Sequence, residues 1–440
     1  MKPESQRKTE VSVIDMTESV CPHCLTTIPA KIIDEDGRVY MVKTCPEHGD
    51  FKVYLWPDAD HYRWCATFDF PATVRAPQRA CSEGCPQSCG LCSSHRNWIS
   101  LAEVEITYKC NMRCPVCFMS AGKRLAEPSF ENIVEQMRSI YKRELKGVAL
   151  QITGGEPTVR LDLFEIIAEA HNIGFSVVEL NTNGIVLGED PSYAQRLVEA
   201  GCSNVYLQFD GVTDDVTASL RRAGVHDLKL RALENCRRAN LPVILAPAIV
   251  RGVNDSQLAK IIDFAMANMD VVQGVSFQPA FVSGRFDVEM DKRISMGDIV
   301  SMIETQTGGR IRARDFYPLN CVSPLCDCST YLVGDEEFYT PLSRSIDEGE
   351  YRNFFKDGST QGSTFVDVAK RKYHGMVPRG MPILIMCFMD AWTFDVHKVQ
   401  RCNLGISTAD GRMVPFCSYH LTDTSGNRLY PYPSAGEVTQ

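Results

Sequence analysis

Strand-like apolar runs alternate with amphipathic stretches through the middle of the chain. The strand-like runs span residues 103–108, 147–153, 175–182, 204–210, 242–250 and 274–280. Helix-like stretches lie between them at residues 130–145, 163–172, 193–200, 228–240 and 256–268. Six strand–helix repeats predict an α/β fold whose parallel sheet is curved or partly closed.

The regions on either side lack this repeat. Residues 1–97 are rich in cysteine and turn residues, so we expect a small irregular region there. Residues 286–440 mix helix-like pieces with scattered cysteines, which predicts an α+β region. We therefore divide the chain into residues 1–97, an α/β core at 98–285, and residues 286–440. A length of 440 residues agrees with this division, because domains usually take about 100–200 residues.

Composition narrows the class of protein. The formal net charge is −9, so no global field would draw the chain to nucleic acid or to an anionic membrane. There is no apolar run of about 18 residues, and hence no transmembrane segment is expected. The N-terminal stretch lacks an apolar signal core, which points to the cytoplasm.

Nineteen cysteines are the unusual feature of the composition. Clustered cysteines in a reducing compartment more often bind metal than form disulfides. Only Cys202 and Cys236 lie outside the clusters, and we interpret them as small apolar fillers.

The motif CNMRCPVC follows the first predicted strand and holds Cys110, Cys114 and Cys117. A [4Fe–4S] cluster is usually held by four thiolates. Three nearby cysteines can hold three irons and leave the fourth open to a small ligand. The alternative is a zinc site that borrows a remote fourth ligand. The strand end favours a ligand site, since ligand-binding residues gather at the carboxyl ends of parallel barrel strands.

This CxxxCxxC motif, followed by the aromatic Phe118, resembles the radical SAM superfamily. The resemblance implies that Cys110, Cys114 and Cys117 are catalytic ligands of a [4Fe–4S] cluster. The open iron would bind S-adenosylmethionine (SAM), whose reductive cleavage releases a 5′-deoxyadenosyl radical. It also implies that residues 98–285 form a partial (β/α)6 barrel.

Four further loops after predicted strands match the same superfamily. GGEP follows the second strand, NTNG the third, QFDG the fourth and IVRG the fifth. Paired glycines allow the backbone to approach a ligand closely, because no Cβ intervenes. The resemblance implies SAM binding by Gly154, Gly155, Glu156, Asn181, Asn183, Gln208, Asp210 and Val250.

The N-terminal cysteines are expected to form two metal centres. CPHC and CPEHG suit a tetrahedral ion held by Cys21, Cys24 and Cys45, as zinc or as a rubredoxin-like iron. The fourth ligand is not decided by the sequence, and His48 and Cys65 are the two candidates. A second group is large enough to enclose a complete [4Fe–4S] cluster, with structural zinc as the alternative: Cys81, Cys85, Cys89 and Cys92.

The C-terminal cysteines resemble the auxiliary-cluster domain of many radical SAM enzymes. The ligands that we expect for one auxiliary cluster are Cys321, Cys326, Cys402 and Cys417. Cys328 and Cys387 are possible replacements, and ordinary buried cysteines are the alternative.

The whole order of motifs resembles a narrower radical SAM group that includes archaeal tetraether lipid synthase and pterin C-methylases. It departs from that group at residues 386–390 and 403–405, near the expected substrate side. The resemblance implies hydrogen abstraction from an unactivated carbon of a lipid-like substrate, for C–C bond formation or other functionalisation. The alternative substrates are a small metabolite such as a pterin, or a peptide. A ferredoxin or flavodoxin is the expected electron donor.

Overall fold

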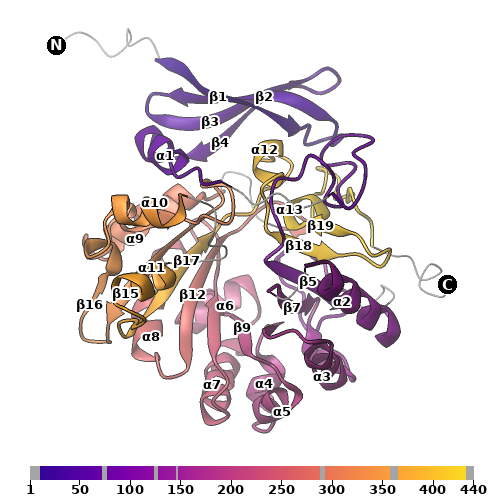
Figure 1. The fold of residues 1–440 in the computed structure, drawn as a ribbon, viewed down its shortest axis with the longest axis vertical. Helices are drawn as coiled ribbons and strands as arrows, with labels where there is room; N and C mark the ends of the chain where they lie inside the picture. The colour runs from indigo at the N-terminus through magenta and orange to yellow at the C-terminus, as the bar shows by residue number, and fades with distance from the viewer. Residues whose placement is uncertain are drawn as a thin grey trace.

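Two sheets organise the molecule in this computed structural model (Figure 1). The structure describes residues 10–71, 77–122, 127–144, 147–287, 293–356 and 365–432. A small four-stranded sheet lies above a large sheet of 13 strands, and helices surround the lower part of the large sheet.

Six parallel strands form the centre of the large sheet in the order β5–β7–β8–β9–β10–β12. They are β5 (Leu101–Thr107), β7 (Ala149–Gly154), β8 (Val178–Thr182), β9 (Asn204–Gln208), β10 (Val243–Ala246) and β12 (Val272–Pro279). Each falls within or next to a strand-like run of the sequence. The α/β prediction is therefore confirmed.

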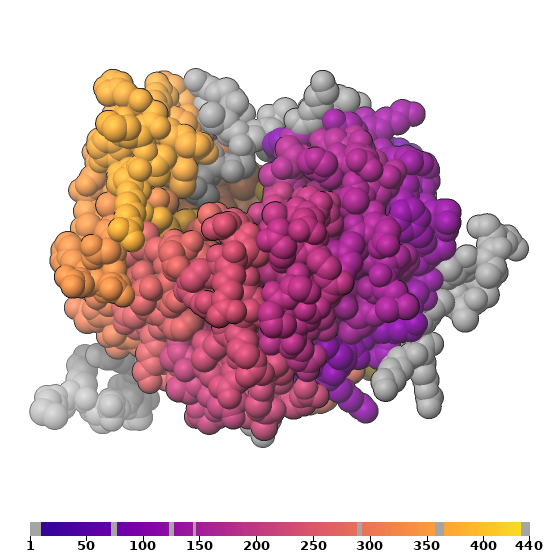
Figure 2. Space-filling model, turned by 90° about the horizontal axis from the view of Figure 1, so that it is seen from below, coloured from indigo at the N-terminus to yellow at the C-terminus, as the bar shows by residue number. Residues whose placement is uncertain are grey.

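Helices cover one face of these strands. They are α2 (Phe130–Glu144), α3 (Leu163–Ile173), α4 (Ile185–Glu189), α5 (Tyr193–Ala200), α6 (Asp214–Leu220), α7 (Val225–Arg238) and α8 (Leu258–Ala267). Alternate strand residues such as Val104, Ile152 and Leu180 pack with the apolar helix faces in one buried core. Figure 2 shows this helical layer from below as a purple-to-red surface, bordered on one side by orange and yellow C-terminal segments.

The C-terminal segments extend the same sheet in both directions. β17 (Gly380–Met386) pairs in parallel with β12, and β18 (Leu404–Ser407) pairs in parallel with β5. The remaining elements are β6 (Val116–Cys117), β11 (Ala248–Ile249), β13 (Arg285–Phe286), β14 (Tyr317–Pro318), β15 (Asp327–Gly334), β16 (Tyr339–Pro341), β19 (Met413–Pro415), α9 (Met296–Gln306), α10 (Glu348–Phe355), α11 (Phe365–Lys372), α12 (Val396–Val399) and α13 (Phe416–Tyr419). The hydrogen-bonded sheet thus runs across the division at residue 285.

The N-terminal region differs from the expected irregular segment. Strands β1 (Val11–Val20), β2 (Thr27–Glu35), β3 (Arg38–Cys45) and β4 (Gly49–Trp56) form an antiparallel meander, followed by α1 (Ala59–Ala66). Buried and less buried residues alternate along β3, as in a sheet with one covered face. The alternation is the sequence signal that predicts strands in this region, whereas the cysteine motifs at the strand ends resemble an irregular metal-binding segment.

Lys43 and Gly297 fix the small sheet to the rest of the chain. The buried Lys43 Nζ donates to Ser19 Oγ, to Val20 O and to the carbonyls of Ala391 and Trp392, at 2.8–2.9 Å. Gly297, at the start of α9, lies against Trp56 of β4, and a Cβ there would come within 2.4 Å of the indole Nε1. The helix therefore reaches the sheet only because residue 297 has no side chain.

Replacing Gly297 with alanine tests this contact. Alanine favours a helix, but here its methyl group must displace Trp56, so we expect destabilisation of about 1–3 kcal/mol. Ser301→Ala, at an exposed position of the same helix, is the control and should be close to neutral. Urea unfolding of the two variants would measure the difference, and equal midpoints would contradict the packing.

Candidate active site and metal centres

Cys110, Cys114 and Cys117 lie on one loop that leaves the carboxyl end of β5. All three thiols are partly accessible. Met112 donates its backbone N–H to Cys110 Sγ at 3.3 Å, and burial raises the pKa of Cys110 to about 12. Three thiols on one short loop suit a [4Fe–4S] cluster with one iron left for SAM.

The far side of this loop is fixed by residues near position 285. Strand β6, within the loop, pairs antiparallel with β13. Arg285 donates from Nη1 to Cys114 O at 2.9 Å and from Nη2 to Ala121 O at 3.1 Å. The cysteine loop is thereby tied to β13 without using a thiol.

Gly154 and Gly155 bring the second predicted SAM loop against the cysteine loop. A Cβ at Gly154 would lie 2.2 Å from Thr107 O, and one at Gly155 would lie 2.2 Å from Lys109 O. Gly155 N donates to Thr107 O and Glu156 N to Lys109 O, both at 2.8 Å. Glycine is therefore required at both positions for this close approach to the cysteine loop, and contact of the same residues with SAM stays a prediction.

Glu156 joins the second and third predicted SAM loops. Its fully buried carboxylate accepts hydrogen bonds from Thr158 Oγ1 at 2.6 Å, Thr182 Oγ1 at 2.7 Å and Asn183 N at 2.7 Å. Burial raises its pKa although these bonds favour the charged form. Because its oxygens are occupied by the protein, Glu156 is placed to hold the loops in position. Asn183 Nδ2 reaches Asn111 Oδ1 of the cysteine loop at 2.8 Å.

Asp210 is a second buried link, and its partner was missed from the sequence. Arg221 of the α6–α7 connection donates to both Asp210 oxygens, at 2.8 and 3.0 Å, and to Val116 O at 3.1 Å. It also interacts with the Cys114 thiol. A lone arginine after a helix carries no motif, so only the fold reveals this contact. Asp210 also accepts from Ala248 N at 3.0 Å.

Lys229 of α7 was missed for the same reason. Its buried Nζ donates to Asn183 O at 3.1 Å and to Gln208 Oε1 at 2.7 Å, and burial lowers its pKa to about 8. The fifth loop is held by Asn254, whose Oδ1 accepts from Val250 N at 2.8 Å. The predicted SAM loops are therefore connected at one end of the sheet.

The structure brings Cys21, Cys24, Cys45 and His48 together, with their donor atoms all within 4.8 Å of one another. Cys45 Sγ lies 3.5 Å from His48 Nδ1 and 4.0 Å from Cys24 Sγ. Cys65 instead lies in the core beside His61 Nε2, at 3.8 Å. Three thiolates and one imidazole suit a tetrahedral zinc ion.

Within the second N-terminal group, Cys85 lies within electrostatic reach of Cys81, Cys89 and Cys92. Cys85 interacts with Cys89, and Cys81 with Cys92. The Cys89 thiol and burial together raise the pKa of Cys85. Within the described residues these thiols do not form a group as tight as the N-terminal one.

The C-terminal cysteines lie next to this second group. Cys326 is within electrostatic reach of Cys402 and Cys417, and Cys321 is within reach of Cys402. Cys402 is in turn affected by Cys89, whose Sγ lies 3.4 Å from Ser418 Oγ.

Cys328 and Cys387, the two alternative ligands of the C-terminal cluster, differ in their surroundings. Cys387 lies within electrostatic reach of Cys417. Cys328 belongs to the large apolar core, where it is within reach of Cys65. Cys387 is thus better placed than Cys328 to replace a C-terminal ligand.

This fold, with a cysteine triad at the carboxyl ends of its parallel strands, defines a radical SAM protein. The model of the radical SAM superfamily matches residues 104–265. The model of the HMPTM N-terminal zinc ribbon domain matches residues 13–57.

Known proteins narrow the assignment. The 7,8-dihydro-6-hydroxymethylpterin dimethyltransferase of Methanocaldococcus jannaschii is 35% identical, over 92% of this chain and 93% of that protein. The mycofactocin maturase MftC of Mycobacterium ulcerans is 34% identical, over 35% of this chain and 41% of that protein. The solved structure of Streptococcus suis SuiB bound to S-adenosylmethionine aligns with a TM-score of 0.41 and 16% identity, over 48% of this chain and 47% of its own.

The chain belongs to the radical SAM superfamily and, within it, to the family of the M. jannaschii dimethyltransferase. It is an enzyme that uses a [4Fe–4S] cluster and SAM and needs an electron donor and a substrate. In the described part of the chain, no helix has the length and apolar character needed to cross a bilayer.

Two variants distinguish the candidate fourth ligands of the N-terminal site. His48→Ala removes a donor from the group and should release about one metal ion per chain, because three thiolates alone leave the tetrahedral site incomplete. Cys65→Ala should retain the ion. The metal content of each variant is measured after extensive dialysis. Loss of metal from Cys65→Ala but not from His48→Ala would show that Cys65, and not His48, is the fourth ligand.

Proposed function

We propose that this enzyme C-methylates a 7,8-dihydropterin that carries a 6-hydroxymethyl group. The relative named for that substrate aligns along nearly the whole chain, from the zinc ribbon to the C-terminal segments. The single structural observation that favours a pterin over a lipid is the polar inner face of the large sheet.

Polar side chains run across the face of the sheet that is turned away from the helices. Glu103, Gln151, Glu179 and Asn204 stand in register on four adjacent strands. The row above them contains Glu105, Thr153, Asn181 and Tyr206. Barrel interiors are usually filled with branched apolar side chains. Carboxyl and amide groups in these rows therefore indicate a polar ligand.

Several groups on this face lack a hydrogen-bond partner. Glu103 is 5% exposed and makes no side-chain hydrogen bond to a described residue, and burial raises its pKa well above the usual range. Asn181 Oδ1 and Ser276 Oγ are also buried without a partner in the described chain. A buried polar group left unpaired costs about 1–3 kcal/mol. A ligand that supplies donors would remove this cost.

One edge of a dihydropterin carries hydrogen-bond donors that match these unpaired groups. Its 2-amino group, N3–H and N8–H are donors in one plane, and a carboxyl group can pair with two neighbouring donors at once. A long apolar chain would leave Glu103 and Asn181 unsatisfied and would add to their desolvation. The inner face thus supports the pterin and not the lipid as substrate.

We assign the SAM-dependent chemistry to the loops at the carboxyl ends of the strands. Cys110, Cys114 and Cys117 would hold the cluster, and loops at 154–156, 181–183, 208–210 and 250 would enclose SAM. Bound there, these cofactors supply a 5′-deoxyadenosyl radical on taking up one electron. C-methylation exchanges a C–H bond for a C–CH3 bond, so it also consumes a methyl donor such as a second SAM.

The flanking cysteines complete the proposal. The N-terminal group would hold zinc, and two auxiliary iron–sulfur clusters would be held by Cys81, Cys85, Cys89 and Cys92 and by Cys321, Cys326, Cys402 and Cys417. Their proximity supports a path for electrons from a ferredoxin or flavodoxin in the cytoplasm. In the proposed division, residues 1–97 hold zinc and one auxiliary cluster, residues 98–285 hold the SAM-binding cluster, and residues 286–440 hold the other auxiliary cluster.

The cysteine triad is tested by its radical product. Cys114→Ala should lower 5′-deoxyadenosine formation at least about 100-fold in anaerobic assays with SAM and dithionite, because the cluster loses a protein ligand. Cys202→Ala is the matched control, since that cysteine is buried between helix and sheet, away from the triad. Normal yield from Cys114→Ala would refute its assigned role.

The substrate is tested at Glu103. Glu103→Gln keeps the size of the side chain but removes the acid, and we expect KM for 6-hydroxymethyl-7,8-dihydropterin to rise about tenfold, equivalent to about 1.4 kcal/mol. Glu165→Gln, on the exposed side of α3, should leave KM unchanged. The measurement is methylated pterin by mass spectrometry. Absence of any methylated product from the wild type would contradict the proposed function itself.

A further inference from the structure

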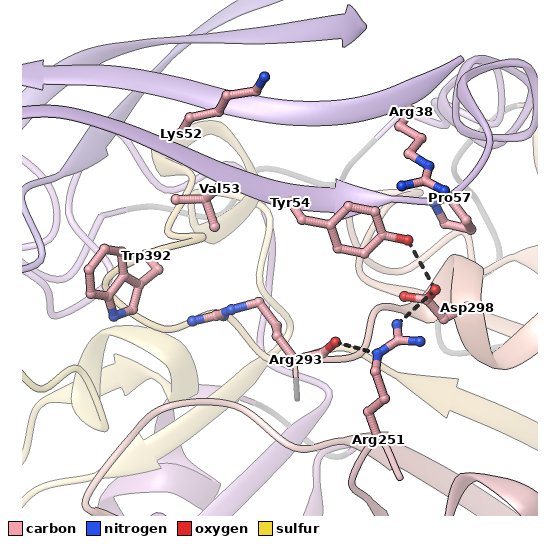
Figure 3. Close-up of a pocket in the computed structure, with 9 residues that line it drawn as sticks. All are labelled: Arg38, Lys52, Val53, Tyr54, Pro57, Arg251, Arg293, Asp298 and Trp392. Carbon is pink, nitrogen blue, oxygen red and sulfur yellow. Dashed lines mark hydrogen bonds and ion pairs between the residues drawn. The ribbon is translucent and has the colours of Figure 1, made fainter. Parts of the chain in front are cut away.

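A cavity of about 640 Å³ lies between the zinc ribbon and the barrel (Figure 3). Strands β3 and β4 of the ribbon contribute Arg38, Lys52 and Tyr54 to its wall. The barrel side contributes Arg251, which lies within the IVRG loop, and Arg293. Small-molecule sites usually occupy about 300–1,000 Å³, so this cavity has the size of a ligand site.

The lining is organised around Asp298, the one carboxylate among the described residues that line the cavity. Its Oδ1 accepts from the Tyr54 hydroxyl at 3.0 Å and from Arg251 Nη2 at 2.9 Å. Its Oδ2 accepts from Ser295 at the start of α9, at 2.7 Å. Figure 3 shows Tyr54 and Arg251 both pointing toward Asp298. This carboxylate positions its neighbours and has little capacity left for a ligand.

Donors remain available around the cavity. Arg38 is exposed and forms no ion pair with a described residue. Arg251 uses Nε on Arg293 O at 3.0 Å and Nη2 on Asp298, which leaves Nη1 unused in the described chain. Lys52 is paired with Glu35, and Arg293 with Asp390. Among the described lining residues, the guanidinium of Arg38 and Nη1 of Arg251 are thus free to bind a ligand that brings acceptor oxygens.

A second, much smaller cavity, of about 50 Å³, adjoins this site. The two cavities share Tyr54 and Arg293, and the smaller one is also bounded by Phe281. The Phe281 ring stacks on Phe118 with centroids 5.9 Å apart, and Phe118 directly follows Cys117. The larger cavity is therefore linked to the cysteine loop by packed aromatic rings.

We propose that the cavity between ribbon and barrel binds a phosphate or carboxylate group carried by the substrate, with Arg38 and Arg251 as its anchors. The inference rests on the proposed function only in taking the rest of the ligand to be a pterin. The parent 6-hydroxymethyl compound has no charged group to place there. Its hydroxymethyl oxygen can carry a phosphate, and an oxidised C6 substituent can be a carboxylate, so both sources present the same chemistry to the two guanidinium groups.

Binding to the full-length, anaerobically reconstituted enzyme tests the proposal. Titration calorimetry compares 6-hydroxymethyl-7,8-dihydropterin, its diphosphate ester and 7,8-dihydropterin-6-carboxylate. We expect at least one charged compound to bind about tenfold or more tightly than the alcohol, and the stronger of the two identifies the anion. Arg38→Gln and Arg251→Gln should each remove most of this preference. Lys31→Gln, an exposed lysine of β2 outside the cavity, is the control and should retain it.

Two outcomes would overturn the proposal. One is that neither charged compound binds more tightly than the alcohol. The other is that Arg38→Gln affects the three affinities no differently from Lys31→Gln. Arg38 is exposed, so its replacement leaves the fold intact even if Arg251→Gln disturbs the ion pair with Asp298. Since affinity and not methylation is measured, failure here leaves the pterin methylation assignment standing, and a failed methylation assay leaves this binding result interpretable.

Discussion

The close contact between two backbone segments, 107–109 and 154–156, is the constraint on which the site depends. It brings the cysteine loop and the GGEP loop together through two amide hydrogen bonds at 2.8 Å. No side chain larger than hydrogen fits at Gly154 or Gly155. Glu156, which directly follows these glycines, accepts hydrogen bonds from Thr182 and Asn183 of the next loop. Neighbouring loops of the site are therefore linked to one another along the sheet.

Two kinds of buried polar group occur in the barrel, and their difference has functional meaning. Glu156 and Asp210 are buried carboxylates whose oxygens are saturated by donors from other loops. Such groups are costly to bury alone but hold a geometry firmly when fully paired. Glu103 and Asn181 Oδ1 are buried without a hydrogen-bond partner among the described residues. The first kind shapes the enzyme, and the second kind is what a ligand would complete.

Much of this architecture was predictable because it depends on local pattern. The six central strands and five of the helices around them follow from apolar periodicity, and the cysteine triad follows from spacing. Arg221 and Lys229 were not predictable, because their partners lie on loops distant in sequence. The sequence around each has only the pattern of an ordinary surface helix. The GGEP motif was also identifiable from the sequence, but its close contact with the backbone of residues 107–109 was not. The sequence did not decide between His48 and Cys65 as the fourth zinc ligand, because spacing alone does not show where either side chain points.

The C-terminal strands show the same limit. β17 and β18 each pair with a strand more than 100 residues earlier in the sequence, and no local signal encodes that pairing. The result is a sheet that links the expected auxiliary-cluster region directly to both edges of the barrel strands. The zinc ribbon, in turn, is held over the barrel by the buried ammonium group of Lys43.

The central claim is that the Cys110–Cys114–Cys117 loop leaves one iron of its cluster free for SAM. Electron–nuclear double resonance of the reduced enzyme with SAM labelled by 15N in the amino group and 17O in the carboxylate tests it most directly. The account predicts hyperfine coupling from both labels to the cluster in the wild type. A reduced cluster that shows neither coupling, with SAM bound elsewhere on the protein, would contradict it.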